Sequence, residues 1–600
     1  MAEDPEWVVP TGSPLRAAFW QSDADQDSDT FDEEAYLNAN PDVAEAVRAG
    51  LVASGREHHD HWGIQEGRDL AFGANDARDR LIPTAGPAGQ QVVFPPAHHS
   101  AEAVVVSQQG GVLILGWVDD IARPLDSIHV VSPGWRITFD GPGLARRLRP
   151  DVGEALGKSG VYPYGYLGFV FADQRIQAYG KCELELRFRD GGAVSAVLDL
   201  RVVDELELRL ILLSHLAGIG HVGGAPTNAI ASLSRGLGDQ VIRFNRSITA
   251  PMTKAPYVER FGGPPRKYRG SIVICLYGRP EYHFIQNALF SNNPGIENYE
   301  FIFVSNSPEL ADTLLANARY AYRTYGLDQT LVLLTGNAGF GAANNVAARL
   351  ASSERILIVN PDVFPKDQLW AQKHLDLIEG RPRNETDIFG VPLYYDDGSL
   401  MHGGMYFELD KGLAFDRNRT SRWNLLRVEH YGKGAPPDSP QFTRPRPVPA
   451  VTGAFISITR PWFEKLGGFT EDYVFGHYED ADLCLKSLQA GCAPWLQDLR
   501  LWHLEGKGST RLPVHEGGSA VNRWLFSSNW GELVSDGLLG PEPSHPLLSE
   551  SAPTRARASA ARRPATPELA SGAPPRPPLR ELMTSGAPSA TSNSVDGTVS

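Results

Sequence analysis

The sequence predicts a chain of several modules, the largest of which is a parallel α/β domain. Three apolar runs, SIVICLYGRPEY, EFIFVSNS and ERILIVNPDVFP, alternate with helical stretches, a pattern typical of a parallel sheet covered by helices on both faces. Upstream, short β-type runs separated by glycine and proline predict a β-rich module. The chain has 600 residues, and a single core rarely extends beyond roughly 250 to 300.

The predicted module boundaries follow shifts in composition. They are an acidic tail over 1–30, a small helical module over 31–75, a β-sandwich-like module over 90–205, a helix and linker over 206–270, the α/β domain over 271–538, and a Pro/Ala/Ser-rich tail over 541–600. Both tails are expected to be disordered because they contain too little apolar surface to bury. In the helical module, Asn40 and Ser54 are placed as N-caps.

The apolar stretch from Leu206 to Val222 is predicted to be a packing helix. Arg209 and His215 interrupt it, and it is too short to span a bilayer. A helix lying in the membrane interface is the alternative, which would make the protein peripheral at the inner face of the membrane.

Composition excludes some function classes. The formal net charge is -15, whereas nucleic-acid binding depends on basic surfaces, so we expect no nucleic-acid partner. The four cysteines are scattered without zinc-type spacing, which favours a reducing compartment. The first residues do not follow the pattern of a signal peptide. We therefore expect a cytoplasmic protein, and the sequence does not indicate an oligomeric state.

Polar motifs follow the ends of the predicted strands, where open α/β sheets bind ligands. They are Tyr277 and Arg279 after the first run, Ser305 and Asn306 after the second, and Asn360 and Asp362 after the third. Asp362 could hold Mg²⁺ or Mn²⁺, which prefer oxygen ligands. Taken alone, the Asn-Pro-Asp sequence would be an ordinary turn.

Two further motifs suggest chemistry. NAGFGAANN predicts a loop and helix start whose free backbone N–H groups can meet an anionic diphosphate. YEDADLCLKSL places Glu479, Asp480 and Asp482 at a helix start. Crowding would raise the pKa of one carboxyl towards the working pH, as a general base requires. The alternative is that acidic residues stand there because the helix dipole favours them.

Together these motifs carry a resemblance. NAGFGAANN, VNPDV, the run from VTGAFISITRPW to YEDADLCLKSL, LWHLEG and NRWLFSSNW resemble the family 2 glycosyltransferases of the GT-A fold, particularly their rhamnosyltransferase-like branch. The resemblance covers Ser271 to about Leu538. Residues 31–75 also resemble a helical repeat often attached to bacterial surface-polysaccharide glycosyltransferases.

The resemblance implies an activity. It is the inverting transfer of a hexosyl or deoxyhexosyl group from a nucleotide-sugar donor to a hydroxyl of a glycan or glycolipid, in the assembly of bacterial surface polysaccharide. A divalent cation, Mn²⁺ or Mg²⁺, would be the cofactor.

The resemblance also assigns residues by position. Asp480 is the expected base, with Glu479 beside it, and Asp362 and His503 are the expected metal ligands. The expected donor contacts are Tyr277, Arg279, Ser305, Asn306, Asn337, Gly339, Phe340, Asn344 and Asn360. The expected acceptor contacts are Gly453, Ala454, Asp482 and His402.

The chain departs from the family at two positions, where Asn360 and Ser305 replace the usual aspartates. These departures favour a rival expectation, a catalytically degenerate relative that serves as a glycan-binding or scaffold protein. A second rival, a polymerising synthase, would carry transmembrane helices and a QxxRW motif.

Overall fold

The computed structural model describes residues 97–158, 163–172, 175–176, 180–217, 232–264, 266–380, 387–409, 425–504 and 513–549, together with 33, 37, 43, 47 and 54–58. All of them belong to one compact unit, Met1–Ala552. The predicted tail over 1–30 and most of the helical module lie outside the described residues, Asn40 included. Within that module α3 (Gly55–His58) follows Ser54, whose Oγ accepts the N–H of Glu57 at 2.9 Å, as expected of an N-cap.

The start of the predicted C-terminal tail is ordered, which corrects its boundary. A 3₁₀ turn, η7 (Pro546–Leu548), packs Leu547 and Leu548 against the main core. Apolar periodicity over so short a segment was too weak to detect. The rest of that tail lies outside the described residues.

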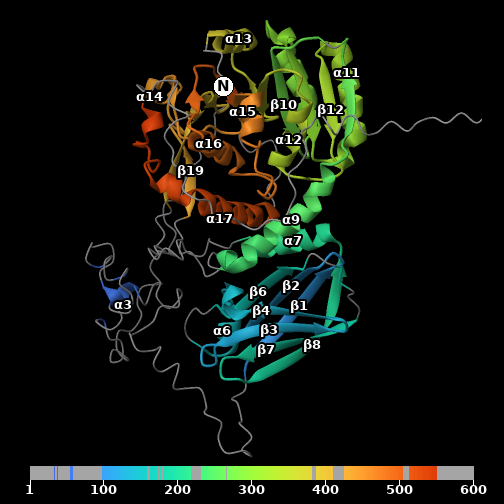
Figure 1. Cartoon of the computed structure of the whole chain (residues 1–600), viewed down its shortest axis with the longest axis vertical. Helices are drawn as coiled ribbons and strands as arrows, with labels where there is room; N and C mark the ends of the chain where they lie inside the picture. Colours follow the sequence, from blue (N-terminus) through green and yellow to red (C-terminus); the bar gives the residue numbers. More distant parts are fainter. Residues whose placement is uncertain are drawn as a thin grey trace, which may run out of the picture. The chain divides into compact units, whose positions relative to one another are not determined.

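The β-rich module is one curled sheet. Its strands are β1 (His99–Ser107), β2 (Gly111–Val118), β3 (Leu125–Ser132), β4 (Trp135–Asp140), β5 (Ala145–Arg147), β6 (Gly165–Phe171), β7 (Lys181–Phe188) and β8 (Ala193–Val203), with helix α6 (Pro150–Ala155) between β5 and β6. Their order is β4-β3-β7-β8-β1-β2-β6-β5. Val106 and Ile114 share a core with Ile128 and Leu184, so two halves of the same sheet face each other (Figure 1).

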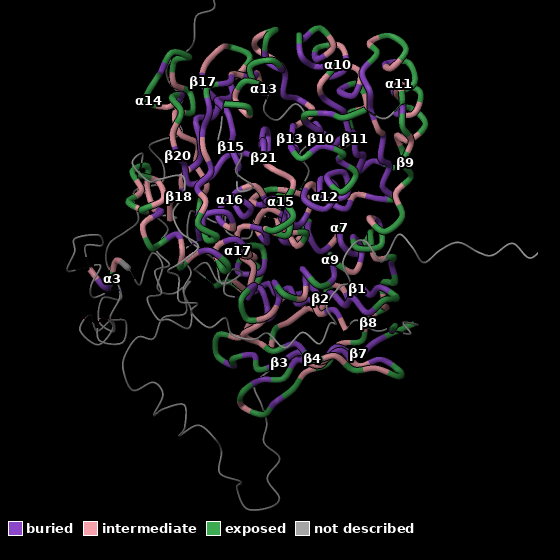
Figure 2. Tube along the Cα trace, turned by 45° about the horizontal axis from the view of Figure 1, so that its top comes forward, coloured by how far each residue is buried: buried purple, intermediate pink, exposed green. Residues whose placement is uncertain are grey.

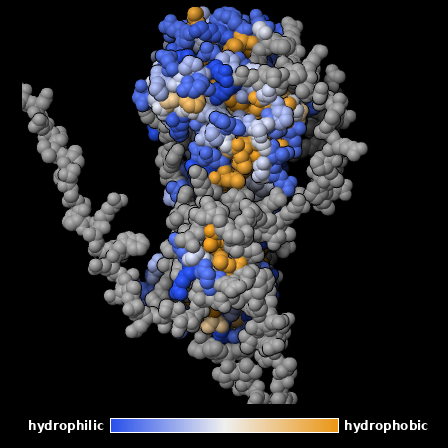
Figure 3. Space-filling view, turned by 90° about the vertical axis from the view of Figure 1, so that its left-hand side faces the viewer, coloured by the Kyte–Doolittle hydropathy of each residue, from blue (hydrophilic) through white to orange (hydrophobic). Residues whose placement is uncertain are grey.

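Helix α7 (Glu205–Leu216) confirms the first part of the packing helix predicted over Leu206–Val222, and residues 218–222 lie outside the described residues. Asp204 caps it by accepting the N–H of Glu207 at 2.7 Å, and Leu208, Leu212 and Leu213 are buried. It lies beside α9 (Gly238–Met252) and α17 (Pro513–Ser535) (Figure 1). Among the described residues, no helix is long and apolar enough to cross a membrane. On the face shown in Figure 3, hydrophobic residues form separate patches among hydrophilic ones.

The α/β domain is built on a nine-stranded mixed sheet in the order β20-β22-β15-β21-β13-β10-β11-β12-β9. The strands are β9 (Tyr257–Phe261), β10 (Gly270–Leu276), β11 (Tyr299–Ser305), β12 (Gln329–Leu333), β13 (Arg355–Val359), β15 (Ile388–Gly390), β20 (Arg446–Pro447), β21 (Phe455–Thr459) and β22 (Trp495–Leu496). Strands β10 to β13 are mutually parallel, as predicted, but β9 and β21 run antiparallel to their neighbours.

Alternating side chains of these strands supply two hydrophobic cores. The helices of the domain are α10 (Glu281–Ser291), α11 (Ala311–Tyr325), α12 (Phe340–Leu350), α13 (Trp370–Gly380), α14 (Pro440–Thr443), α15 (Arg460–Lys465) and α16 (Glu479–Gln489). Helices α10, α11 and α13 cover one face of the sheet, and α12 and α16 cover the other. The central strands and α12 are buried along almost their whole length (Figure 2).

The expected linker before the α/β domain is wrong in part. Tyr257–Phe261 forms edge strand β9, which pairs antiparallel with β12. The Pro, Gly and basic residues on either side concealed its short β-type pattern.

Two smaller sheets join distant segments. One has the order β14-β23-β16-β17 and contains β14 (Val363–Pro365), β16 (Leu393–Tyr394), β17 (Leu400–His402) and β23 (Leu501–His503); the other pairs β18 (Met405–Leu409) with β19 (Leu426–His430). In the first, Val363 pairs with His503. A turn at Asp397-Gly398 joins β16 to β17, with Gly398 at φ 88°.

The close approach of α17 to α7 is the first feature to test. A Cβ at Gly517 would overlap the carbonyl oxygen of Leu213, whereas a Cβ at Gly531, also in α17, would meet nothing within 4 Å. We expect Gly517→Ala to destabilise the protein by about 1–3 kcal/mol. Gly531→Ala should be neutral or stabilise by up to about 1 kcal/mol. Chemical denaturation of both variants checks this, and equal midpoints would contradict the described packing.

Candidate active site

The structure brings Asp362 and His503 together, as the resemblance predicts. Asp362 follows the end of β13, and His503 ends β23. The antiparallel pairing of β14 with β23 places His503 Nε2 3.4 Å from Asp362 Oδ1. Both side chains are buried. Backbone pairing therefore fixes the geometry of the pair.

The donor set around this pair suits a hard divalent cation. Asn360 Oδ1 and His503 Nδ1 are buried without a hydrogen-bond partner. Carboxylate, carbonyl and water oxygens suit Mg²⁺ and Mn²⁺, which usually keep waters and substrate phosphates in their shell. Among the described residues, no group of three or more His, Cys, Asp or Glu residues could hold a metal ion. Asp362 and His503 are in contact and Asn360 lies two residues before Asp362, so these three residues could supply at most part of a coordination shell.

Asp480 lies at the start of α16 with its carboxylate held by backbone groups. Oδ2 accepts the N–H of Gly453 at 2.7 Å, and Oδ1 accepts the N–H of Ala481 at 2.8 Å. The side chain is only partly buried. A carboxylate has about four lone-pair sites, so lone pairs remain for a ligand. The expected acceptor contact Gly453 thus lies against the expected base, and Ala454 is its neighbour in the chain.

A short chain of contacts links the metal-ligand motif to the base. The N–H of Asn360 donates to the carbonyl oxygen of Ala454 at 3.0 Å, and the neighbouring Gly453 donates to Asp480. A Cβ on Gly453 would also meet the ring of Phe340 at 3.4 Å. Three motifs far apart in the sequence thus meet at one edge of the sheet.

Glu479 has a different environment from Asp480. It is buried, and its Oε2 has no hydrogen-bond partner. Burial, followed by repulsion from Asp480 and Asp482, raises the pKa of Glu479 well above its usual value. Burial is therefore the main cause, crowding adds to it as predicted, and the raised pKa belongs to the buried neighbour of the expected base. We interpret Glu479 as a neutral group that supports the base.

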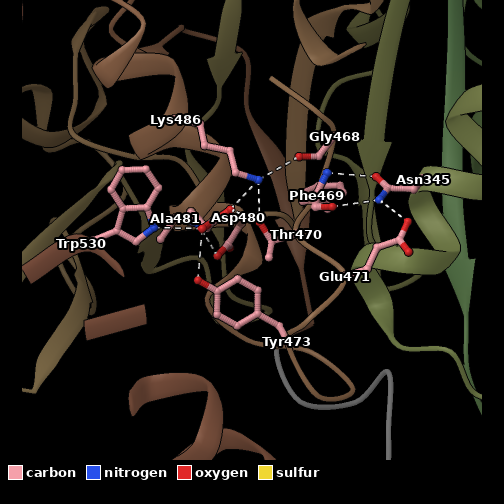
Figure 4. A network of polar contacts seen from close by, with 11 residues as sticks. Asn345, Gly468, Phe469, Thr470, Glu471, Tyr473, Asp480, Ala481, Lys486 and Trp530 are labelled. Carbon is pink, nitrogen blue, oxygen red and sulfur yellow. Dashed lines mark hydrogen bonds and ion pairs between the residues drawn. The ribbon is translucent and has the colours of Figure 1, made fainter. Parts of the chain in front are cut away.

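Asp482 is engaged by the protein and is poorly placed as an acceptor contact. Its Oδ2 accepts from Thr470 Oγ1 at 2.6 Å and pairs with Lys486 Nζ at 2.8 Å. Its Oδ1 accepts from Tyr473 Oη at 3.2 Å and from Trp530 Nε1 at 2.9 Å. Figure 4 shows these donors converging on the start of α16. Asp482 therefore connects α16 to α17 and to the loop that precedes α16.

The start of α12 differs from the prediction of free N–H groups. The N–H of Ala338 donates to Asn306 Oδ1 at 3.1 Å, and that of Gly339 donates to Asn337 Oδ1 at 3.0 Å. The N–H of Phe340 donates to the carbonyl oxygen of Phe475 at 2.5 Å. These three N–H groups already donate within the protein. They are therefore not free to contact a diphosphate, contrary to the expectation. Gly339 has φ 92°, a backbone conformation that favours glycine at this position.

Three other expected donor contacts face the protein. Ser305 is buried, and its Oγ accepts the N–H of Ser307 at 3.1 Å. Asn306 also donates to Gly339 O at 3.2 Å, so it fastens β11 to the loop before α12. Asn344 is fully buried and donates to Phe340 O at 2.9 Å, one turn back in its own helix. Short polar residues at strand ends and helix starts bond to nearby backbone in this way.

Of the remaining sequence-predicted residues, Tyr277 and Arg279 are at least partly exposed and His402 lies close to His503. Tyr277 is half-buried, 6.3 Å from the His515 ring between centroids, and Arg279 is exposed and paired with Glu281 at 3.3 Å. His402 is fully buried, with Nδ1 3.0 Å from Nδ1 of His430 and Nε2 without a partner. Burial lowers the pKa of His402 well below its usual value, and His430 and His503 add to the effect. His402 is therefore a neutral group close to His503.

Sequence reasoning missed the role of Asn522, although its motif NRWLFSSNW was recognised. Phe475, His477 and Tyr478, just before Glu479, all have positive φ, at 60°, 83° and 77°. Non-glycine residues rarely adopt this conformation.

Asn522, fully buried on α17, holds the segment. Its Oδ1 accepts the N–H of Val474 at 2.6 Å, and its Nδ2 donates to the carbonyls of Val474 at 3.0 Å and Gly476 at 2.7 Å. An asparagine between apolar residues of a helix was the available signal.

Gln286 was missed as well. It is fully buried on α10. Its Nε2 donates to the carbonyl oxygens of Asn360 at 3.1 Å, Pro361 at 2.7 Å and Val363 at 2.9 Å. This amide fixes the turn that carries Asp362, which no local pattern in the sequence indicates.

Asn522→Ala tests the first of these clamps. Each net hydrogen bond is worth about 0.5–1.5 kcal/mol, so we expect faster amide hydrogen exchange across residues 474–478 and a loss of global stability of about 1–3 kcal/mol. Ser528→Ala is the control, because Ser528 Oγ donates only within α17, to Trp524 O at 2.9 Å. Unchanged exchange in residues 474–478 of the Asn522 variant would contradict the clamp.

The chain is similar in sequence to three curated proteins. It is 29% identical to the uncharacterized protein y4gI of Sinorhizobium fredii over 214 residues, 35% of this chain and 21% of that protein. It is 26% identical to the O-antigen biosynthesis protein RfbC of Myxococcus xanthus over 336 residues, 52% of this chain and 24% of RfbC. It is 25% identical to inactive polypeptide N-acetylgalactosaminyltransferase-like protein 5 of Macaca fascicularis over 241 residues, 38% and 49% of the two chains.

The chain thus spans between about a fifth and a half of the length of these relatives. No family model matches it. Among solved structures, the mannosyltransferase PcManGT from Pyrobaculum calidifontis, in complex with GDP-Man and Mn²⁺, has a TM-score of 0.27 and 13% identity over 52% of this chain and 87% of that one. GalNAc-T7 with UDP, GalNAc and Mn²⁺ has a TM-score of 0.30 and 16% identity over 46% and 50%. The fold described above therefore rests on the strand order and register of this chain.

Proposed function

We propose that the protein is an inverting glycosyltransferase of the family 2, rhamnosyltransferase-like type. It moves a hexosyl or deoxyhexosyl group from a nucleotide sugar to a hydroxyl of a glycan or glycolipid. The similarity to an O-antigen biosynthesis protein supports a role in bacterial surface-polysaccharide assembly. The proposal places the protein on the cytoplasmic side of the membrane, where nucleotide sugars are made.

One observation carries the proposal. The Asp362 and His503 pair and the Asp480 carboxylate come from distant parts of the sequence, yet the contacts of Asn360 with Ala454 and of Gly453 with Asp480 join them at the carboxyl edge of the parallel strands. This is the edge at which open α/β sheets bind ligands. A cation-binding pair and a general base are the two groups that direct transfer from a nucleotide sugar needs.

Asp480 supplies the base. The N–H groups of Gly453 and Ala481 fix the direction of its carboxylate, which remains partly exposed. A free lone pair takes the proton of the acceptor hydroxyl as its oxygen attacks the anomeric carbon, and the bond to the diphosphate breaks on the opposite side. Burial raises the pKa of the neighbouring Glu479 well above its usual value, and Asp482 is held in an ion pair with Lys486.

Asp362, His503 and the carbonyl of Asn360 would hold the divalent cation. When bound, Mn²⁺ or Mg²⁺ neutralises the charge that develops on the diphosphate leaving group. The chain's own part is to keep these ligands in place through the pairing of β14 with β23 and the hydrogen bonds of Gln286.

Asp480→Asn tests the base. We expect kcat for sugar transfer to fall by about 10²–10⁴-fold, the usual contribution of general base catalysis, while binding of the nucleoside diphosphate stays unchanged. Asp472→Asn is the matched control, because Asp472 lies in the same segment and pairs with Arg246 outside the site. Steady-state kinetics and calorimetry supply the two readouts. Full activity of the Asp480→Asn variant would contradict the role of Asp480 as the general base.

Asp362→Asn tests the cation site. A ligand that binds only the native state raises its melting temperature, so wild type should show a larger shift with a nucleoside diphosphate when Mn²⁺ is present. We expect Asp362→Asn and His503→Ala to lose this increment, with apparent Mn²⁺ affinity lowered by about tenfold or more. Asp367→Asn, just beyond β14 and paired with Lys373, should retain it. An intact Mn²⁺ increment in both site variants would exclude these ligands.

Asn360 favours a second candidate function, a degenerate relative that binds glycan without catalysis. Its neutral side-chain carbonyl occupies the position where the family has a carboxylate. One carboxylate fewer is therefore available to hold a cation. Mn²⁺-dependent hydrolysis of a nucleotide sugar without acceptor would show catalysis and exclude this candidate. Glycan binding without any nucleotide binding would support it.

A further inference from the structure

Arg209 is a buried guanidinium without a carboxylate partner. It lies on α7, ahead of the α/β domain, and is 6% exposed. Its Nη1 donates to Asn245 Oδ1 at 3.3 Å, and its Nε has no hydrogen-bond partner. Among the described residues, no carboxylate lies within ion-pair distance of it. A buried cation in this state is unfavourable by several kcal/mol unless an anion compensates it.

The surroundings of Arg209 belong to the donor side of the candidate active site. Its guanidinium lies over the ring of Phe475, 4.9 Å from the centroid. His515 of α17 lies 5.4 Å from Phe475 and 6.3 Å from Tyr277, measured between ring centroids. Arg209 also lies near enough to Tyr277 to interact with it electrostatically. Tyr277 directly follows β10, at the sheet edge where the nucleotide is expected.

From this geometry we propose that Arg209 binds a phosphate of the nucleotide donor, so that α7 supplies part of the donor site. The proposal rests on the proposed function and deepens it. It also takes the place of the N–H groups of Ala338, Gly339 and Phe340, which donate to Asn306, Asn337 and Phe475.

The alternative is that Arg209 only packs. Burial lowers the pKa of its guanidinium to about 10, still far above neutral pH, so the side chain remains charged. A structural arginine in this position would usually be paired. Replacing an uncompensated buried charge by an apolar side chain of similar volume is often neutral or stabilising for the fold. The two roles therefore predict opposite effects on the stability of the protein without nucleotide.

Arg209→Met separates the two roles. Calorimetry of the full chain at low salt would use UDP, GDP and dTDP with Mn²⁺, the parent nucleosides, and inorganic pyrophosphate as probes. We expect the affinity for the bound nucleoside diphosphate to fall by about tenfold or more, as for loss of a charge-assisted hydrogen bond. Affinity for the nucleoside should stay unchanged, and the melting temperature without nucleotide should be equal to or higher than that of wild type. Arg209→Lys, which keeps the charge, should restore part of the affinity.

Arg201→Met is the matched control. Arg201 lies on β8, just before α7, is exposed, and pairs with Glu207 at 2.7 Å, so its loss should leave diphosphate binding unchanged. Wild-type affinity in Arg209→Met, or a lower melting temperature without nucleotide, would overturn the role of Arg209 and leave the proposed function standing. A wild-type protein that binds no nucleoside diphosphate would overturn both.

Discussion

The backbone from Val474 to Tyr478 is the constraint on which the site depends. Three of its non-glycine residues have positive φ, and such conformations cost on the order of 1–3 kcal/mol each and persist only where surrounding structure enforces them. The amide of Asn522 enforces them from α17. As a result, the carbonyl oxygen of Phe475 accepts the N–H of Phe340 at the start of α12, and α16 begins at Glu479. This strained segment thus connects the loop before α12 with Asp480 and with α17.

This arrangement separates three neighbouring carboxyl groups. Because α16 begins at Glu479, successive residues point in different directions: Glu479 inward without a partner, Asp482 towards Lys486 and Trp530, and Asp480 towards Gly453. Burial raises the pKa of the first well above its usual value, and ion pairing and hydrogen bonds occupy the second. Only Asp480 retains both exposure and free lone pairs. A cluster that looks redundant in the sequence therefore has one member able to accept a proton.

The sequence predicted what depends on local pattern. Strands β10, β11 and β13 and the helices between them follow from apolar runs, and the pairing of Asp362 with His503 followed from the resemblance. The occupied N–H groups before α12 could not be predicted, since their partners Asn306 and Phe475 come from other segments. The same holds for Gln286 and Asn522, whose amides bind backbone of remote loops. Strand β9 was missed because edge strands are short and Pro and Gly surround it.

The β-rich module and the α/β domain share one hydrophobic core through α7, α9 and α17. Leu113 and Phe169 of the curled sheet belong to the same cluster as Leu208 of α7 and Ile358 of the central sheet. Gly517 lets α17 approach the backbone of α7 at Leu213, and His515, two residues earlier, contacts Phe475.

The packing of α7 against α17 therefore sets the positions of Arg209 and His515 together. The segment expected to be a helix and linker thus forms part of the structure around Tyr277. We expect substitutions in the contact between α7 and α17 to disturb the surroundings of Tyr277 before the rest of the site.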